Sequence, residues 1–305
     1  GLTILAGTHS HGQGHATTYA QMAAEWLGVP FDSIRFLQGD TDAVPFGRGT
    51  YAARSSLLGG SALRLAADAM IEKARLLAAY LLEAASEDVS FKDGVFAIAG
   101  TDRSLPLVQV AKAAYRGGGM PARYLGLEAS GTWAADPPNY PNGCHAAEVE
   151  VDAETGAVAL VRYSVVDDIG RVVNPMIATA QVHGALAQGV GQALMEAVAY
   201  DEAGQLLSGS FADYAMPRAG DLPPFAVAFE ELPATTNPLG VKGVGETGTV
   251  AAPAAVVNAI LDALRPLGLD DLATPATPER VWRALQETRN SGGATSADAS
   301  RHGRA

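Results

Sequence analysis

Five polar segments rich in glycine separate the apolar stretches of this 305-residue chain. In sequence order they read HGQGHATT, GDTD, GRGTYAARSS, NPMIATAQVHGALAQGVGQ and NPLGVKGVGETGT. Glycine lets backbone N–H groups approach a ligand closely, and helix N-termini bind anions. One such segment would indicate only a tight turn. Five of them in one chain indicate a binding surface for an extended ligand with phosphates and polar rings.

The apolar stretches between these segments mix the periodicities of strands and helices. LTILAG and SIRFLQGD predict strands, whereas Tyr19, Ala23, Trp26 and Leu27 recur at helical spacing before a stop at Gly28. VSFKDGVFAIAG predicts a hairpin that turns at Asp93-Gly94, and a second hairpin is predicted around DAETGA. Further helices are predicted over 53–85, 178–197 and 250–264, and after a cap at Thr277.

The motifs YRGGGM and DPPNYPNG interrupt this pattern near the middle of the chain. We therefore predict an α+β fold of two lobes, with the first over 1–125 and the second over 126–287. The polar segment 288–305 is predicted to be a disordered tail. The chain opens on a strand-like run without methionine, so we expect a fragment, a processed subunit or an excised domain.

Charge and cysteine content exclude several classes of function. Acidic residues outnumber basic ones by 33 to 21, for a net charge of -12, and no basic patch typical of a nucleic-acid binder is visible. The single cysteine, Cys144, excludes an intrachain disulfide and a site with several cysteine ligands for zinc or an iron–sulfur cluster. No apolar run reaches the ~18–20 residues of a membrane span.

The last glycine-rich segment contains the spacing Gly243-x-Gly245-x-x-Gly248 with Glu246 inside it. This spacing alone would indicate a nicotinamide-dependent dehydrogenase, but the motif should follow a buried strand, and the preceding EELPATTNPLGVKG has little strand character. A second reading is a glycine-rich turn whose carboxylate lies near a helix N-terminus, where the helix dipole favours it. We rank the dehydrogenase last.

The histidines and the cysteine give weaker signals. His9, His11 and His15 cluster within seven residues, but no further ligand follows at a convincing spacing, so structural roles are favoured over metal binding. Cys144 and His145 are adjacent and would point to opposite faces of a strand, which argues against a catalytic dyad. We expect Cys144 to be an ordinary core residue.

Taken together and in order, the glycine-rich segments resemble the C-terminal half of the molybdenum hydroxylases. This is the family of xanthine oxidase, aldehyde oxidase and the large subunit of aerobic carbon monoxide dehydrogenase. GQGHATTYAQMAAEWLGVP, GDTDAVPFGRGTYAARS, VEVDAETG, NPMIATAQVHGALAQGVGQAL and NPLGVKGVGETG carry the likeness, which extends to about Leu285. It is nearest to the carbon-monoxide-dehydrogenase-like branch in bacteria.

The resemblance implies a role for the carboxylate inside the glycine-rich loop. Glu246 would lie beside molybdenum and act as the general base that activates an oxygen nucleophile supplied by water. A carboxylate in a dry, glycine-lined pocket has its pKa raised by desolvation, toward the range in which a general base works best. The glycines would then let the loop approach the cofactor, with Glu246 facing the metal and not a phosphate.

The resemblance also implies which segments hold the cofactor, a molybdopterin in its cytosine dinucleotide form. The residues expected to contact it are Gln13, Gly14, His15, Thr17, Thr18, Gly49, Thr50, Arg54, Ser55, Gln181, Gln188, Lys242, Gly243, Val244 and Gly245. None of these is expected to ligate the metal.

The large subunit of this family is about twice as long as this chain. The resemblance therefore implies a partner that supplies the upstream half with its substrate-selecting loop, together with iron–sulfur and FAD subunits that accept electrons in the cytoplasm. Aldehydes, N-heterocycles and carbon monoxide all remain open as substrates. A non-catalytic cofactor-binding or assembly subunit remains the alternative.

Overall fold

The computed structural model describes residues 1–116, 119–135 and 137–299, with side chains described up to 290. The chain divides into two compact units, each built from separate segments. Unit 1 comprises Gly1–Tyr140, Ile169–Ile177 and Glu231–Gly243, and unit 2 comprises Pro141–Asp168, Ala178–Glu230 and Val244–Ala305. The sequence predicted a single boundary near 125, whereas the chain first changes unit after Tyr140 and then returns twice to unit 1.

The described residues of unit 1 form two small sheets and three α-helices. Strands β1 (Leu2–Ala6) and β2 (Ile34–Gln38) pair in parallel, and α1 (His15–Leu27) connects them. The second sheet is antiparallel, in the order β3 (Val89–Lys92), β4 (Val95–Ile98) and β5 (Ser104–Pro106). A π-helical turn at Ser55–Gly60 leads into the long α2 (Ser61–Leu81), and α3 (Leu107–Arg116) follows β5.

The predicted helix end at Gly28 and the predicted hairpin turn at Asp93-Gly94 are both confirmed. Gly28 ends α1 at φ 61°, and Asp93 and Gly94 both have positive φ, as a two-residue type I′ hairpin requires. A Cβ on Gly28 would lie 2.2 Å from the backbone nitrogen of Gly94. The helix stop and the hairpin turn therefore pack directly on each other, which only glycine permits.

Two cores stabilise unit 1. One gathers the inner faces of α2 and α3 with β3 and β4, around Leu77, Phe96 and Val110, which are fully buried. The other lies between β1 and α1, around Ile4 and Tyr19, and includes Leu239 and Val241 from the last segment of the unit. Burial of these late residues is what ties Glu231–Gly243 to the start of the chain.

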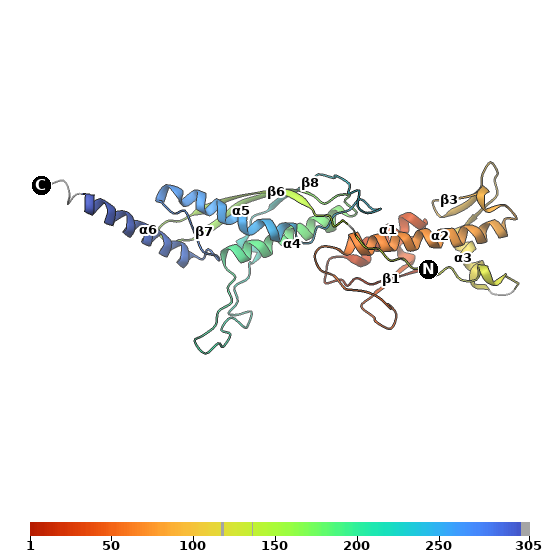
Figure 1. Ribbon diagram of the computed structural model, residues 1–305, viewed down its shortest axis with the longest axis horizontal. Helices are drawn as coiled ribbons and strands as arrows, with labels where there is room; N and C mark the ends of the chain where they lie inside the picture. The colour runs from red at the N-terminus through yellow and green to blue at the C-terminus, as the bar shows by residue number, and fades with distance from the viewer. Residues whose placement is uncertain (117–118, 136, 300–305) are drawn as a thin grey trace. The chain divides into compact units, whose positions relative to one another are not determined.

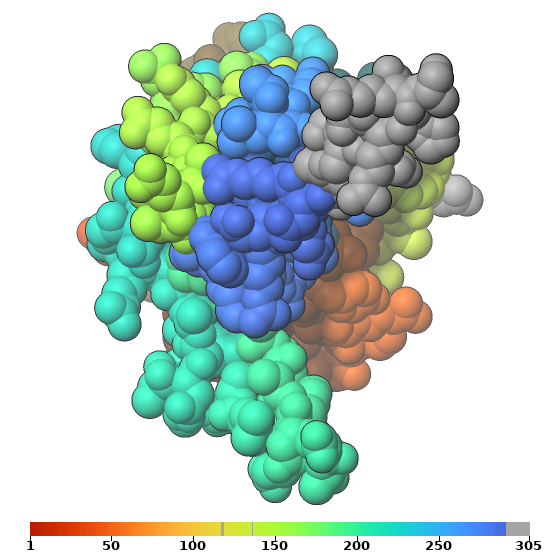
Figure 2. All heavy atoms as spheres, turned by 90° about the vertical axis from the view of Figure 1, so that its left-hand side faces the viewer, coloured from red at the N-terminus to blue at the C-terminus, as the bar shows by residue number. Residues whose placement is uncertain are grey.

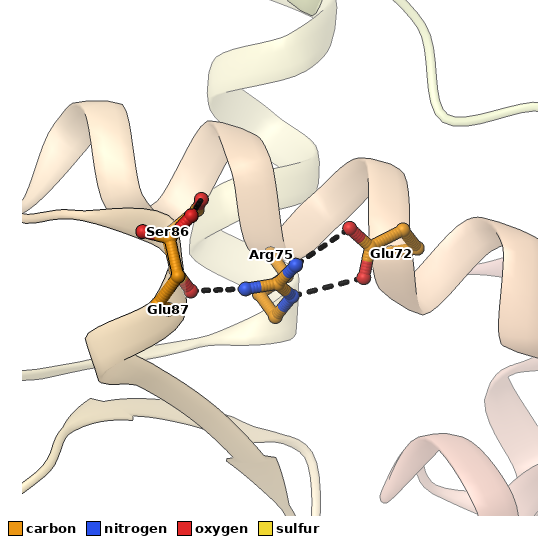
Figure 3. A network of polar contacts seen from close by, with 4 residues as sticks. All are labelled: Glu72, Arg75, Ser86 and Glu87. Atoms are coloured by element: carbon orange, nitrogen blue, oxygen red, sulfur yellow. Dashed lines mark hydrogen bonds and ion pairs between the residues drawn. The ribbon is translucent and has the colours of Figure 1, made fainter.

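At the surface of unit 1, an arginine links α2 to the start of the β3–β4 hairpin (Figure 3). The Arg75 guanidinium donates to both carboxylate oxygens of Glu72, at 2.7 and 2.9 Å, and to the carbonyl oxygen of Ser86. This bidentate pair lowers the pKa of the Glu72 carboxyl from its usual range. The contact fixes how the end of α2 meets the hairpin.

Unit 2 is a three-stranded sheet covered by helices. β6 (Asn142–Val151) and β7 (Val158–Asp168) form the predicted hairpin, and β8 (Phe225–Phe229) pairs with β7 in parallel. Helices α4 (Pro175–Leu194) and α5 (Thr247–Leu264) run along this sheet (Figure 1). Between α4 and β8 a long arm leaves the body of the unit, and Figure 2 shows it projecting, in teal.

The core of unit 2 takes one face of each helix. Ala252, Val256, Ile260 and Leu264 recur every four residues along α5 and are buried against the sheet and α4. Thr247–Leu267 is long and apolar enough to cross a membrane by length and composition. The buried stripe instead identifies α5 as a core helix. The α+β fold class predicted from the sequence is confirmed by both units.

The final helix, α6 (Pro278–Ala299), begins after Thr277, whose hydroxyl accepts a 3.4 Å hydrogen bond from the backbone N–H of Arg280, as predicted for its cap. Val281 and Leu285 anchor its first turns in the core. The helix extends over 288–299, which is part of the segment expected to be a disordered tail. Residues 300–305 lie outside the described residues. Short 3-10 helical turns lie between these elements, at Phe31–Ser33, Ser86–Asp88, Ala122–Tyr124, Ala219–Asp221 and Arg265–Leu267.

Candidate functional site

All five glycine-rich segments contribute residues to one region of unit 1, beside the β1–β2 sheet and the start of α1. The imidazole of His9 lies against Gly39, where a Cβ would be 3.0 Å from the ring, and the His9 N–H donates to Thr50 Oγ1 at 3.1 Å. Ile177 packs on Gly14, and Gly243 packs on the backbone of Ala53. Segments separated by up to about two hundred residues therefore converge, as the extended-ligand interpretation requires.

Gln13 and Gly14 form the turn that begins α1. Gly14 has φ 76° and serves as the N-cap without a side-chain hydrogen bond, so the first turn of α1 keeps its amide dipole for an anion. The Gln13 side chain folds back on its own loop: its Oε1 accepts from the N–H of His11, and its Nε2 donates to the carbonyl oxygen of His9 at 3.4 Å. Gln13 therefore shapes the loop.

The following residues of α1 differ in exposure. His15 is buried, stacks on Tyr19 with ring centroids 5.3 Å apart, and leaves its Nδ1 without a hydrogen-bond partner among the described residues. Burial lowers the pKa of His15 because it penalises the imidazolium form. Thr18 is also buried and donates its hydroxyl to the Gly14 carbonyl oxygen at 3.2 Å, whereas Thr17 is half-buried. The Thr18 hydroxyl is thus hydrogen-bonded within the first turn of α1.

The segment from Gly49 to Ser55 is strained and tightly bonded. Ala52 and Ala53 have φ of 50° and 48°, an uncommon conformation for residues other than glycine that clusters at functional sites. Thr50 Oγ1 and Ser55 Oγ lie 2.7 Å apart, so the two hydroxyls close the loop. Arg54 stacks its guanidinium over the Tyr51 ring, 4.6 Å from the centroid. The predicted contact residues of this segment are therefore held as one unit.

Tyr19 supports both loops, although its spacing predicted only a helical core position. It is 1% exposed, and its hydroxyl donates to the Ser55 carbonyl oxygen at 2.7 Å. Burial raises the pKa of the Tyr19 phenol to about 12, which keeps it protonated as a donor. Phenylalanine would satisfy the same helical pattern, so periodicity carries no signal for this hydroxyl.

Two asparagines that the sequence reading missed shape the approach to Lys242 and Gly243. Asn237 is buried, donates to the carbonyl oxygen of Val241 at 2.9 Å and accepts from the Val241 N–H at 3.2 Å. Asn139 donates to the same carbonyl oxygen at 3.1 Å. The Asn-Pro dipeptide in the fifth segment was the available signal for the first, since asparagine commonly bonds the backbone of its own turn.

In unit 2, Glu246 is the N-cap of α5, but its carboxylate makes no capping hydrogen bond. The residue is exposed, so the dry surroundings expected for this carboxylate are not formed within unit 2. Val244 and Gly245 lead into it. Nearby, Thr249 donates to the Ala185 carbonyl oxygen at 3.0 Å and lies 3.4 Å from Gln188 Oε1, which brings Gln188 beside the first turn of α5. Gln181 lies two turns earlier on α4 and is half-buried.

The glycines around Glu246 let two helices approach closely. A Cβ on Gly248 would lie 2.7 Å from the Leu186 nitrogen, and one on Gly189 would lie 2.7 Å from the Ala252 Cβ. The spacing of Gly243, Gly245 and Gly248 is not a dinucleotide-binding turn, because no strand directly precedes it in the described chain. Gly243 and Gly248 instead let the backbone pack closely on Ala53 and on α4.

Comparison with known proteins identifies the family of this chain. Residues 1–223 match the family described as the molybdopterin cofactor-binding domain. The chain belongs to this family. It is 41% identical over 288 residues to the nicotine 6-hydroxylase large subunit of Paenarthrobacter nicotinovorans, and 37% identical over 286 residues to the carbon monoxide dehydrogenase large chain of Hydrogenophaga pseudoflava.

Solved structures agree with these relatives. The molybdopterin-binding chain superposes on a crystal structure of Cu,Mo-CO dehydrogenase with a TM-score of 0.85 at 34% identity, and on quinoline 2-oxidoreductase from Pseudomonas putida 86 with 0.83 at 39%. These matches cover 94% and 93% of the chain but 36% of either structure. The two sequence relatives are covered over 35% of their length, with 93% and 92% of this chain aligned. The chain thus spans about a third of the proteins it resembles, where the sequence led us to expect about half. The family predicted from its motifs is confirmed.

The donor set of this molybdopterin-binding chain fits a polar, phosphate-bearing cofactor. Gly12 and Gly49 have positive φ and open space where a Cβ would stand, the start of α1 has no side-chain cap, and His15 Nδ1 is an unpartnered buried polar atom. Among the described residues, no group of three or more His, Cys, Asp or Glu side chains could hold a metal ion. The open glycine positions and the start of α1 would hold the organic part of a cofactor.

One expectation from the sequence is wrong. Cys144 was expected to be a core residue, but it is exposed, because it lies on the outer face of β6. The neighbouring His145 points to the opposite face, as predicted, and bonds Tyr163 at 2.9 Å and Asp167 at 3.1 Å. Those contacts bury His145 away from Cys144, so the two side chains do not form a dyad.

Proposed function

We propose that this chain is the molybdopterin-binding, C-terminal portion of a molybdenum hydroxylase. The enzyme would oxidise an aldehyde, an N-heterocycle or carbon monoxide with water as the oxygen source. The observation that carries this proposal is the convergence of five glycine-rich segments on the start of α1 in a member of the molybdopterin cofactor-binding family. The names of the relatives, which include a hydroxylase and a dehydrogenase, support an oxidoreductase.

The proposed contacts of the chain with the cofactor divide by chemistry. The uncapped start of α1, at Gly14 and His15, offers backbone N–H groups to a phosphate, and Thr17 stands beside them. Thr50, Ser55 and Arg54 offer hydroxyl and guanidinium groups from a loop held rigid by its own hydrogen bonds. Gln181 and Gln188 of α4, and the backbone of Lys242, Gly243, Val244 and Gly245, would complete the contacts. We propose the cytosine dinucleotide form of the cofactor.

The bound cofactor would supply a two-electron acceptor for the reacting carbon and a Lewis acid that makes the water-derived oxygen more acidic. Within the chain, Glu246 would be the general base and accept a proton at a carboxylate oxygen from the water-derived nucleophile. Its carboxylate is suited to this role because it does not cap α5 and remains available. The exposure of Glu246 requires that groups other than its unit 2 neighbours exclude water around it during turnover.

Since this chain spans about a third of its relatives, the proposed enzyme needs further polypeptide. We propose that this comprises the upstream portion of the molybdenum subunit, an iron–sulfur subunit and an FAD subunit, in the cytoplasm. The substrate is set outside this chain, because the substrate-selecting loop is expected in the upstream portion.

The test is cofactor content. The chain would be purified alone and together with the products of its neighbouring genes, from a host that makes the cofactor, and molybdenum and released cytidine nucleotide would be measured per chain. We expect near-stoichiometric amounts of both in the assembled complex. A complex that contains neither, from a host in which a known molybdenum hydroxylase is loaded, would contradict the proposal and favour a non-catalytic assembly subunit.

A further inference from the structure

The arm of unit 2, residues 196–218 between α4 and the turn at Ala219–Asp221, has an apolar surface that nothing in its unit covers. All residues from 197 to 213 are exposed except Ser208. Large apolar side chains are nevertheless frequent in the arm. They are Val198, Tyr200, Leu206, Leu207, Phe211 and Met216, with exposures of 61, 62, 40, 55, 88 and 48%.

The arm is held in a defined shape by local hydrogen bonds. Its first part is a short hairpin, with a bridge between Tyr200 and Leu206 and a turn in which Asp201 Oδ1 accepts from the N–H groups of Ala203 and Gln205. Its second part is a turn at Ser210, and the Tyr214 hydroxyl bonds Glu196 at the base of the arm, at 2.7 Å. The apolar side chains are thus presented by an ordered backbone.

An isolated hairpin is marginal in water, and a contiguous exposed apolar surface marks an interaction site. We propose that the arm is an interface for the remaining portion of the molybdenum subunit. This inference rests on the proposed function, in which this chain works together with that portion. The equivalent of this chain makes up 35% of each aligned relative, and the remaining two-thirds or so of the relative's length is the material available to cover the arm.

The apolar character of the arm suits a permanent contact with this portion of the enzyme. Permanent interfaces are large and apolar and resemble a domain core. Phe211 is flanked by the small Ser210 and Ala212, so its ring stands free to enter a pocket. Aromatic anchors of this kind supply most of the stability of an interface.

The experiment replaces Phe211 by the photoreactive p-benzoylphenylalanine in the assembled enzyme and maps the cross-link by mass spectrometry. We expect a cross-link to the portion of the molybdenum subunit outside these 305 residues, whether on the same polypeptide or on a separate chain. A cross-link to a second copy, to an iron–sulfur or flavin subunit, or to residues 1–305 of the same chain would overturn the inference. Photolysis without any protein cross-link would also overturn it.

A matched pair of substitutions gives an independent measurement. Phe211→Ser should lower the yield of assembled enzyme at least tenfold, whereas Val108→Ser, at a 57% exposed position on α3, should leave it unchanged. Equal yields from both variants would count against the interface. Molybdenum content separates the two proposals: a cross-link to the expected portion in a molybdenum-free enzyme would leave the interface standing and remove the proposed function.

Discussion

The hydroxyl of Tyr19 donates a 2.7 Å hydrogen bond to the carbonyl oxygen of Ser55, and this joins α1 to the strained loop before α2. Both groups are buried, so neither has water as an alternative partner. The contact connects two of the five glycine-rich segments through a residue outside the predicted cofactor contacts.

Tyr19→Phe should destabilise the chain, because it leaves the Ser55 carbonyl oxygen buried without this donor. We expect a loss of about 1–2 kcal/mol in the free energy of unfolding, measured by urea denaturation. Tyr140→Phe, at a 70% exposed position, is the matched control and should change stability little. Equal effects from the two variants would show that the hydroxyl of Tyr19 is dispensable.

Two glycines of α4 should respond in opposite directions to alanine. Gly184 has no atom within 4 Å of a Cβ, so Gly184→Ala should raise the free energy of unfolding by up to ~1 kcal/mol through helix propensity. At Gly189 a Cβ would lie 2.7 Å from that of Ala252, so Gly189→Ala should cost about 1–3 kcal/mol through overpacking. Urea unfolding of both variants checks this, and a stabilised Gly189→Ala variant would contradict the close approach of α4 and α5.

Glu246→Gln should reduce turnover by the assembled enzyme about 10²–10⁴-fold, because the amide cannot accept the proton. Molybdenum per chain should stay unchanged, since the carboxylate is not expected to hold the cofactor. Carbon monoxide, an aldehyde and quinoline, each with an artificial electron acceptor, serve as test substrates. Glu154→Gln, in the exposed β6–β7 turn, is the control. Wild-type turnover by Glu246→Gln would remove the general-base assignment.

Stability should depend on pH through His15. Its folded pKa lies below 6.5 because burial penalises the imidazolium, so the unfolded chain binds more protons as the pH falls through 6.5. The stability that comes from keeping His15 neutral is fully present above pH 6.5, and it is lost progressively as the pH falls below 6.5 toward the folded pKa. His15→Gln should therefore flatten the decline in stability between pH 7 and pH 5, relative to the exposed control His183→Gln. Parallel profiles for the two variants would exclude this contribution.

The sequence predicted those features that depend on local chemistry. The backbone at Gly28 and at the Asp93-Gly94 turn has positive φ, a conformation that glycine and aspartate favour, so the sequence indicates these positions. The Thr277 cap is predictable because its hydroxyl can accept a hydrogen bond from the first turn of the helix. The family followed from ordered motifs. Within the candidate site, the sequence singled out the glycine-rich segments as a group, whereas their individual contacts with a cofactor stay predictions.

Hydrogen-bond partners that lie far apart in the sequence could not be predicted in the same way. Asn139 and Asn237 meet at the Val241 carbonyl oxygen only after folding, and one of them lies 102 positions away from it. The alternation in β6 shows that Cys144 and His145 face opposite sides, but not which side meets the core. The exposure of Glu246 likewise depends on which groups surround the start of α5, beyond its own loop.

Unit 1 is assembled from three separate lengths of chain, and the last of them ends at Gly243. Translation proceeds from the N-terminus, so a nascent chain that has reached β7 still lacks Leu239 and Val241, two members of the β1–α1 core. The β1–α1 core therefore stays incomplete until that last segment is made, whereas the core between α2, α3 and the β3–β4 hairpin lies within the first 140 residues. When Gly243 emerges, the segment that completes unit 1 leads within three residues to Glu246, so the fold around the cofactor loops and the proposed base finish synthesis together.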